Sequence, residues 1–346
     1  MDDNEIKTPV LDHRRLSLPQ LAGQRIMVGF DGLVLEDELK GYIRDQLAGG
    51  VVLFSRNVAD PDQVAALTRS IMDFALDCGQ PPPFIAVDQE GGRVARLKAP
   101  FTEFPGNPSI RTREEALAFA DACARDLRRA GFNMNYAPVL DVAVEGFADS
   151  VMEGRVFPGD AAGVAALGEA VISRFQENGI LAVGKHFPGI GRTTLDSHKD
   201  LPVSDVPRED LFSVELVPFR AAARCQAAGI MLGHVIYRNL DPDWPASLCV
   251  AVARDILRGQ LGYQGVVMTD DLDMGAVNGR YPIPLCMERV FAADIDQVLI
   301  CHPGPNVAAA FDAAVRLLES DPDILDRGRA SAQRILADKK RMAFIG

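Results

Sequence analysis

Residues 50–89 read GVVLFSRNVADPDQVAALTRSIMDFALDCGQPPPFIAVDQ, and this stretch decides the fold. It contains two apolar runs, GVVLFS at 50–55 and FIAVDQ at 84–89, on either side of a helical pattern at 60–78 that opens with a capping Asp. Both runs are apolar at consecutive positions, which is typical of strands covered on both faces of a sheet. The stretch therefore predicts a unit of strand, helix and parallel strand.

The same alternation extends over the chain on both sides of this stretch. Six further runs share the apolar character: RIMVGF (25–30), FNMNYAPVLDV (132–142), ILAVGKH (180–186), GIMLGHV (229–235), GVVMTDD (265–271) and QVLICH (297–302). Helical patterns lie between the runs, and the clearest are at 113–130, 160–178, 207–227, 249–260 and 305–319.

Eight runs of this kind fit a closed (β/α)8 barrel better than an open doubly wound sheet, because no G-x-G-x-x-G turn follows the first run. We therefore predict an α/β protein with a single TIM-type barrel domain over residues 1–346. Residues 1–20 form an N-terminal lead-in in this interpretation, and residues 320–346 form a C-terminal helical tail.

Composition narrows the classes of function. The 346 residues carry a formal net charge of −12, and no basic patch is segregated from the rest, so we expect neither nucleic acid nor a membrane surface as a partner. No apolar run approaches the roughly 18 residues of a membrane span, and the N-terminus lacks a secretory pattern, so we expect a cytoplasmic protein. The six cysteines are scattered, which favours reduced thiols over a disulfide framework or a zinc knuckle.

The chemistry of a (β/α)8 barrel lies at the C-terminal ends of its strands. The polar residues that end the apolar runs are therefore the candidates for a site, namely Asp88, Asp141, Lys185, His186, His234, Asp270, Asp271 and His302. Three of the segments at these ends are long and polar, at 87–97, 184–202 and 265–277. Polar loops on a rigid barrel normally carry the groups that bind substrate.

These segments contain recognisable motifs in a fixed order. They are VDQEGGRV (87–94), NMNYAPVLDV (133–142), GRVFPGD (154–160), KHFPGIG (185–191), DSH (196–198), PASL (245–248) and TDDLDM (269–274). Together they resemble glycoside hydrolase family 3, from about residue 22 to residue 302. The likeness is greatest to the single-domain bacterial β-N-acetylglucosaminidases that release GlcNAc from muropeptides during cell-wall recycling.

The resemblance implies a retaining exo-β-N-acetylglucosaminidase that needs no metal or other cofactor. Asp270 matches the nucleophile that forms a covalent glycosyl intermediate, and His198 with Asp196 matches the general acid/base pair. The residues that would bind the sugar are Asp88, Arg96, Arg155, Lys185 and His186. The expected partner is a small carbohydrate, such as a GlcNAc-containing muropeptide or oligosaccharide, and the expected state is a monomer.

Other functions remain open from the sequence. Lys185 could form a Schiff base in an aldolase, the His and Asp residues could hold a metal for hydrolysis, and the barrel could be a non-catalytic sugar sensor. Within the family, a related β-glycosidase or a GlcNAc phosphorylase is the alternative. Ile190, where His is usual, Arg192 and Pro158 depart from the subfamily pattern, and these departures concern the substrate more than the reaction type.

Overall fold

The computed structural model describes residues 11–144, 151–193, 195, 197 and 200–343. Eight parallel strands form a closed barrel in the order β1-β12-β11-β9-β7-β6-β3-β2. Each overlaps one of the eight apolar runs, so the predicted (β/α)8 barrel is confirmed. The strands are β1 (Ile26–Gly29), β2 (Gly50–Leu53), β3 (Phe84–Val87), β6 (Met134–Asn135), β7 (Leu181–Phe187), β9 (Gly229–Leu232), β11 (Val266–Asp271) and β12 (Gln297–Ile300).

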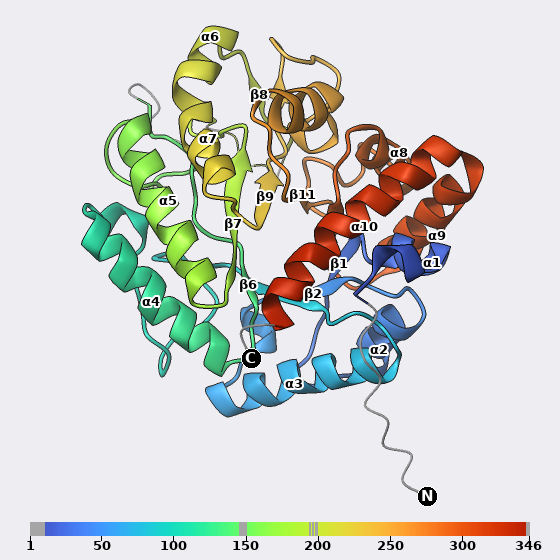
Figure 1. The fold of residues 1–346 in the computed structure, drawn as a ribbon. Helices are drawn as coiled ribbons and strands as arrows, with labels where there is room; N and C mark the ends of the chain where they lie inside the picture. Colours follow the sequence, from blue (N-terminus) through green and yellow to red (C-terminus); the bar gives the residue numbers. More distant parts are fainter. Residues whose placement is uncertain (1–10, 145–150, 194, 196, 198–199, 344–346) are drawn as a thin grey trace, which may run out of the picture.

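Helices surround this barrel (Figure 1). They are α2 (Asp37–Arg44), α3 (Pro61–Asp77), α4 (Arg113–Arg129), α5 (Ala161–Glu177), α6 (Arg208–Asp210), α7 (Leu216–Arg224), α8 (Ile283–Ala292) and α9 (Pro305–Ser320), with π-helical turns at Leu211–Glu215 and Ala251–Gln260. Two of these helices, α2 and α8, are not among the clearest helical patterns of the sequence. The second of these, IPLCMERVFA, is mostly apolar and so lacks the broad polar face that marks a surface helix.

Shorter elements complete the chain. Two small sheets lie beyond the strand ends: β4 (Gln89–Gly91) pairs antiparallel with β5 (Val94–Ala95), and β8 (Val203–Ser204) pairs parallel with β10 (Ile236–Tyr237). Short 3-10 turns occur at His13–Arg15, Ser55–Asn57, Asn107–Ser109 and Ala246–Leu248. Among the described helices, none combines the length and the apolar character needed to cross a bilayer.

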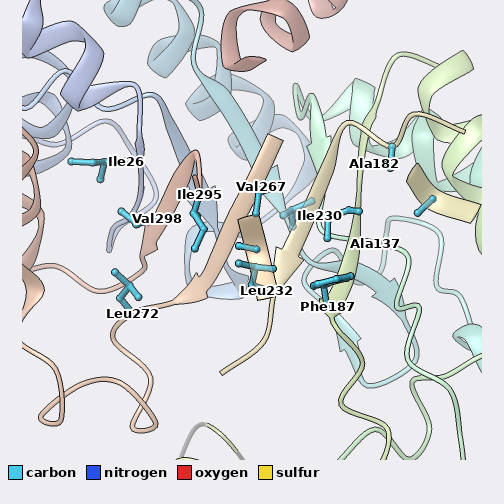
Figure 2. Close-up of a cluster of buried hydrophobic side chains, with 14 of the residues drawn as sticks. Ile26, Ala137, Ala182, Phe187, Ile230, Leu232, Val267, Leu272, Ile295 and Val298 are labelled. Atoms are coloured by element: carbon cyan, nitrogen blue, oxygen red, sulfur yellow. The ribbon is translucent and has the colours of Figure 1, made fainter. Parts of the chain in front are cut away.

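The barrel strands are apolar on both sides, as the consecutive apolar runs predict. Val52 packs in the barrel interior, while its neighbour Val51 packs in the layer between strands and helices. Figure 2 shows part of that outer layer, where Ile230 and Leu232 of β9 lie near Phe187 of β7. The alternation follows from side chains pointing to opposite faces along a strand.

A C-terminal helix covers the N-terminal mouth of the barrel. This helix, α10 (Pro322–Ala343), follows α9 and also contacts the N-terminal α1 (Leu18–Gly23); in Figure 1 it runs across the barrel. Its Lys339 ammonium is buried and donates to the carbonyl oxygen of Gly49, just before β2, at 2.7 Å. With this mouth covered, a ligand would enter the barrel from the opposite end.

Candidate active site

A cavity of about 730 Å³ opens at the C-terminal ends of the barrel strands. Its volume lies within the roughly 300–1,000 Å³ of small-molecule sites. Six predicted site residues line it, namely Asp88, Arg96, Arg155, Lys185, His186 and Asp270. The other two, Asp196 and His198, lie outside the described residues, although Ser197 between them lines the cavity. The structure thus gathers residues from four strand ends that are far apart in the sequence.

Asp88 joins two cations on one wall of the cavity. It directly follows β3, and its carboxylate oxygens lie 2.6 Å from the Lys185 ammonium and 3.1 Å from the Arg96 guanidinium. Lys185 is in β7, and its side chain is only 3% exposed. These contacts fix the orientation of the carboxylate and of both cations before any ligand binds.

Glu90 extends this network deeper into the protein. Its carboxylate accepts two hydrogen bonds from the Arg155 guanidinium, at 2.7 and 2.9 Å, and one oxygen lies 2.8 Å from Lys185. Such a two-point contact fixes both partners in one plane. Asp88, Lys185, Glu90 and Arg155 therefore form one alternating chain of charges.

The network stays ionised despite its burial. Burial alone would raise the pKa of the two carboxyls and lower the pKa of Lys185, but attraction between the opposite charges outweighs it. The pKa of Asp88 and of Glu90 is therefore lowered, and the pKa of Lys185 is raised. A protonated Lys185 has no lone pair with which to attack a carbonyl carbon, which argues against the Schiff-base alternative.

A hairpin places Arg96 in the cavity. The buried Gln89 side chain accepts hydrogen bonds from the backbone N–H groups of Arg96 and Leu97, at 2.8 and 3.0 Å, and donates back to the Leu97 carbonyl oxygen. Gln89 itself is tied to the end of the neighbouring strand, because its N–H donates to Asn135. The sequence DQEGGRVAR therefore folds back on itself so that two of its charged side chains meet.

The floor of the cavity is apolar. Val52, Tyr136, Met231 and Leu299 line it, and all four belong to the cluster inside the barrel. The Tyr136 hydroxyl is buried and finds no hydrogen-bond partner among the described residues. An apolar floor below a charged wall suits a sugar ring, which has C–H faces and hydroxyl edges.

Adjacent acids at the end of β11 take different roles. Asp270 lines the cavity, and one of its carboxylate oxygens accepts a hydrogen bond from the N–H of Asp271 at 2.9 Å. Asp271 instead accepts from the N–H groups of Asp273 and Cys301, both at 3.0 Å. Burial raises the pKa of Asp271 to about 6. Both acids line the cavity, but Asp271 is held by two backbone N–H groups of the surrounding loops, whereas Asp270 accepts one from its neighbour.

One group of residues that line the cavity could hold a metal. Single ligand atoms of Asp271, Asp273 and His302 lie within 4.8 Å of one another. Asp273 is already engaged by hydrogen bonds from Asn306 and from the His302 backbone. The three residues offer the donor types that divalent cations accept, but their atoms are also bound within the protein.

Two buried acids are absent from the catalytic and sugar-binding residues that the resemblance implies, although the strand ends had already made Asp141 a candidate. Glu90 was visible in the same loop as Asp88, two positions later, but its pairing with Arg155 depends on chain segments far apart in sequence. Asp141 ends a predicted strand, and the structure places it 2.8 Å from His186 Nδ1. Of the departures from the subfamily pattern, Ile190 lines the cavity, whereas Pro158 is absent from the described lining.

The whole barrel matches a known protein family. Residues 17–343 match the glycosyl hydrolase family 3 N terminal domain. A beta-hexosaminidase of Alkalilimnicola ehrlichii is 38% identical over 308 residues, which cover 86% of this chain and 85% of that protein. The beta-hexosaminidase of Thiobacillus denitrificans is also 38% identical, over 80% of this chain and 78% of that protein.

Solved structures agree with this match. A family 3 beta-N-acetylglucosaminidase from Paenibacillus sp. str. FPU-7 has a TM-score of 0.90 and 37% identity over 96% of this chain, which spans 64% of that longer protein. The beta-N-acetylhexosaminidase of Beutenbergia cavernae has a TM-score of 0.85 and 33% identity, over 94% of this chain and 99% of that one. NagZ from Neisseria gonorrhoeae, in complex with N-trifluoroacetyl-D-glucosamine, has a TM-score of 0.75 and 28% identity over 93% and 96% of the two chains.

A closed barrel with carboxylates and fixed cations around one open mouth is the arrangement of a TIM-barrel enzyme with a small-molecule site. The chain belongs to glycosyl hydrolase family 3 and is a glycoside hydrolase of the β-N-acetylhexosaminidase type.

Proposed function

We propose that the chain is a retaining exo-β-N-acetylglucosaminidase with Asp270 as its nucleophile. The observation that carries this proposal is the state of Asp270 in the cavity. Lys185, Arg96 and Arg155 are engaged by other carboxylates, and no cationic side chain among the described residues forms an ion pair with Asp270. A carboxylate held by one backbone N–H and free of cations keeps an oxygen for attack on an anomeric carbon.

The reaction would proceed in two displacements. A carboxylate oxygen of Asp270 bonds to the anomeric carbon as the glycosidic C–O bond breaks, and the leaving oxygen takes a proton. Water then attacks the anomeric carbon of the glycosyl ester, loses a proton and releases the carboxylate. The proposed proton carrier is His198 with Asp196. Ser197, which lies between them in the sequence, supports this proposal because it lines the cavity. Its carbonyl oxygen accepts a hydrogen bond from the Ala276 N–H at 3.0 Å, which holds it beside the loop after β11.

The charged wall would bind the sugar. Asp88 can accept hydrogen bonds from sugar hydroxyls, Arg96 and Lys185 can donate to them, and His186 offers its Nε2 nitrogen. Because Asp88 holds Arg96 and Lys185, and Asp141 holds His186, little side-chain freedom is lost when the sugar binds.

A muropeptide or another anionic GlcNAc conjugate is the proposed natural substrate. Arg56 and Arg93 line the cavity in addition to the sugar-binding cations. Arg93 forms no ion pair with a carboxylate in the described part of the chain, and it is exposed. Arg56 pairs with Asp31 at 2.7 Å, so Arg93 is the cavity cation that lacks a carboxylate partner among the described residues. In a chain of net charge −12, such a cation favours a carboxylate on the aglycone.

Activity assays test this proposal directly. We expect hydrolysis of aryl β-GlcNAc with net retention, and much slower hydrolysis of aryl β-glucoside and aryl β-xyloside. Equal rates on the three would contradict the GlcNAc assignment. A rate that rises with phosphate, with formation of GlcNAc 1-phosphate, would instead identify the phosphorylase alternative.

The cellular setting is also part of the proposal. None of the six cysteines is in a disulfide, which supports a reducing compartment such as the cytoplasm. We propose a monomer, and size-exclusion chromatography with light scattering would test it.

A further inference from the structure

Asp141 is a fully buried carboxylate in the wall behind the cavity, and all of its described partners are hydrogen-bond donors. It is 0% exposed. One oxygen lies 2.8 Å from His186 Nδ1 and 3.2 Å from the His186 backbone nitrogen. The other accepts a hydrogen bond from the Ile190 N–H at 2.7 Å. No lysine or arginine among the described residues forms an ion pair with it.

These contacts set the chemistry of His186. A carboxylate has no hydrogen to donate, so the hydrogen between the two groups is carried by Nδ1 of His186 and faces Asp141. Nε2 has no hydrogen-bond partner in the described part of the chain, and the side chain lines the cavity. The ring is therefore fixed in one orientation with one nitrogen left for a ligand.

The same carboxylate also fixes the start of the loop after β7. Ile190 lines the cavity beside His186, and a Cβ added at Gly233 would lie 3.1 Å from the Ile190 side chain and 3.3 Å from the His186 Cβ. The Ile190 carbonyl oxygen accepts from the Thr193 hydroxyl and N–H, so the anchored turn continues to residue 193. One buried group thus holds both a cavity side chain and the loop that leads toward residues 196–198.

We propose that Asp141 is a positioning residue for the hydrolase. It acts on sugar binding through His186, and it acts through Ile190 on the turn at 190–193, which precedes the proposed proton carriers at 196 and 198 in the sequence. This inference rests on the proposed function. Because every neighbour donates, an amide at this position would bring an NH₂ group against an N–H donor. Asp141→Asn keeps the size of the side chain, but it should lose one contact and weaken the other, because one neutral carbonyl oxygen replaces two charged ones.

A double-mutant cycle tests this on two substrates. With an activated nitrophenyl β-GlcNAc, which needs little proton donation, Asp141→Asn should raise KM by about tenfold or more. In a His186→Ala background, Asp141→Asn should raise KM by less than twofold, because Asp141 acts on sugar binding through His186. With a poor leaving group, such as a GlcNAc disaccharide, Asp141→Asn should lower kcat further even in that background.

Controls keep the outcomes separate. Asp126→Asn changes another buried acid, which accepts from the Thr102 N–H in a different part of the fold, and should leave KM unchanged. On the activated substrate, an equal rise in KM from Asp141→Asn in the wild-type and His186→Ala backgrounds would overturn the proposal. If Asp141→Asn does not fold, His186→Gln, which leaves Asp141 in place, must still raise KM by about tenfold, and an unchanged KM would overturn the proposal too. A wild-type enzyme that fails to cleave aryl β-GlcNAc would refute the proposed function instead.

Discussion

Asp88 pairs with two cations of the cavity wall, so we expect the loss of its charge to weaken catalysis. Asp88→Asn keeps the size of the side chain but removes the charge that Lys185 and Arg96 contact. We expect kcat/KM to fall by about 10- to 100-fold, the equivalent of one charged hydrogen bond of about 1.5–3 kcal/mol. Steady-state kinetics on aryl β-GlcNAc would measure this loss.

The fold should survive this change, because Lys185 keeps its ion pair with Glu90 at 2.8 Å. Asp121→Asn is the matched control, since it breaks an ion pair with Arg174 on the helix layer and should leave kcat/KM unaltered. A melting temperature that collapses while each folded molecule stays fully active would show that Asp88 is structural.

His198 is the residue whose role follows from the resemblance alone. His198→Ala should slow substrates with poor leaving groups by about 10²- to 10⁴-fold, because only these need a proton in the transition state. Substrates with activated aryl groups should be affected far less. Asp196→Ala should produce a milder form of the same pattern, and equal losses on both substrate types would refute the assignment.

At the scale of the elements, the end of β11 must hold Asp270 still. His234 follows β9 and is buried; its Nε2 lies 2.8 Å from the carbonyl oxygen of Asp271, and its Nδ1 lies 2.6 Å from the Ser247 hydroxyl. Because a carbonyl oxygen only accepts, Nε2 carries the hydrogen of that contact, and Nδ1 is the nitrogen that meets the Ser247 hydroxyl.

We expect His234→Ala to lower kcat by about tenfold and to change KM less, since one buried hydrogen bond that steadies the nucleophile strand is lost. Ser247→Ala removes only the support for the imidazole ring and should cost less. Kinetics on aryl β-GlcNAc, with circular dichroism to confirm folding, would check both. A loss confined to KM would contradict this role.

The elements of the barrel could be predicted because their signal is local. Strands buried on both faces read as consecutive apolar residues, and each of the eight runs overlaps a strand. The β4 and β5 hairpin gave no such signal, because QEGGRVA is polar and rich in Gly, and its fold depends on the buried Gln89 side chain. The π-helical turn at Ala251–Gln260 has no sequence signature of its own.

The residues of the site could also be predicted only in part. Asp88, Lys185 and Asp270 could be predicted because the barrel places strand ends around one mouth. The pairing of each acid with its base could not, because contacts such as Glu90 with Arg155 join segments distant in sequence. Asp271 and Asp270 are neighbours in sequence, and only the backbone N–H groups around them separate their roles.

At the scale of the molecule, the helix that covers the N-terminal mouth of the barrel carries a buried carboxyl group. Asp338 of α10 is buried, accepts from Arg341 at 3.0 Å and has a second oxygen without a partner among the described atoms. Burial raises the pKa of Asp338 to about 7, against an ordinary value of 3.8. Between these values the folded state binds a proton that the unfolded chain does not, so this group lowers the free energy of unfolding as pH rises from about 4 to about 7.

Asp338→Asn should therefore raise the free energy of unfolding at pH 8 by about 1–3 kcal/mol and leave it nearly unchanged at pH 4. Chemical denaturation at both pH values would measure this difference. Asp326→Asn, which alters a 76% exposed acid on the same helix, should have no effect at either pH. A lower stability of Asp338→Asn at pH 8 would mean that the charge is needed there.

The proposed retaining mechanism requires a covalent intermediate on Asp270. A GlcNAc analogue with a fluorinated ring and a good leaving group should form the glycosyl ester and release it slowly. Peptide mass mapping of the trapped enzyme is the most direct measurement, and we predict one sugar on the peptide that contains Asp270, absent from Asp270→Asn. A label on Asp271, or complete turnover with inversion and no trapped ester, would contradict the mechanism.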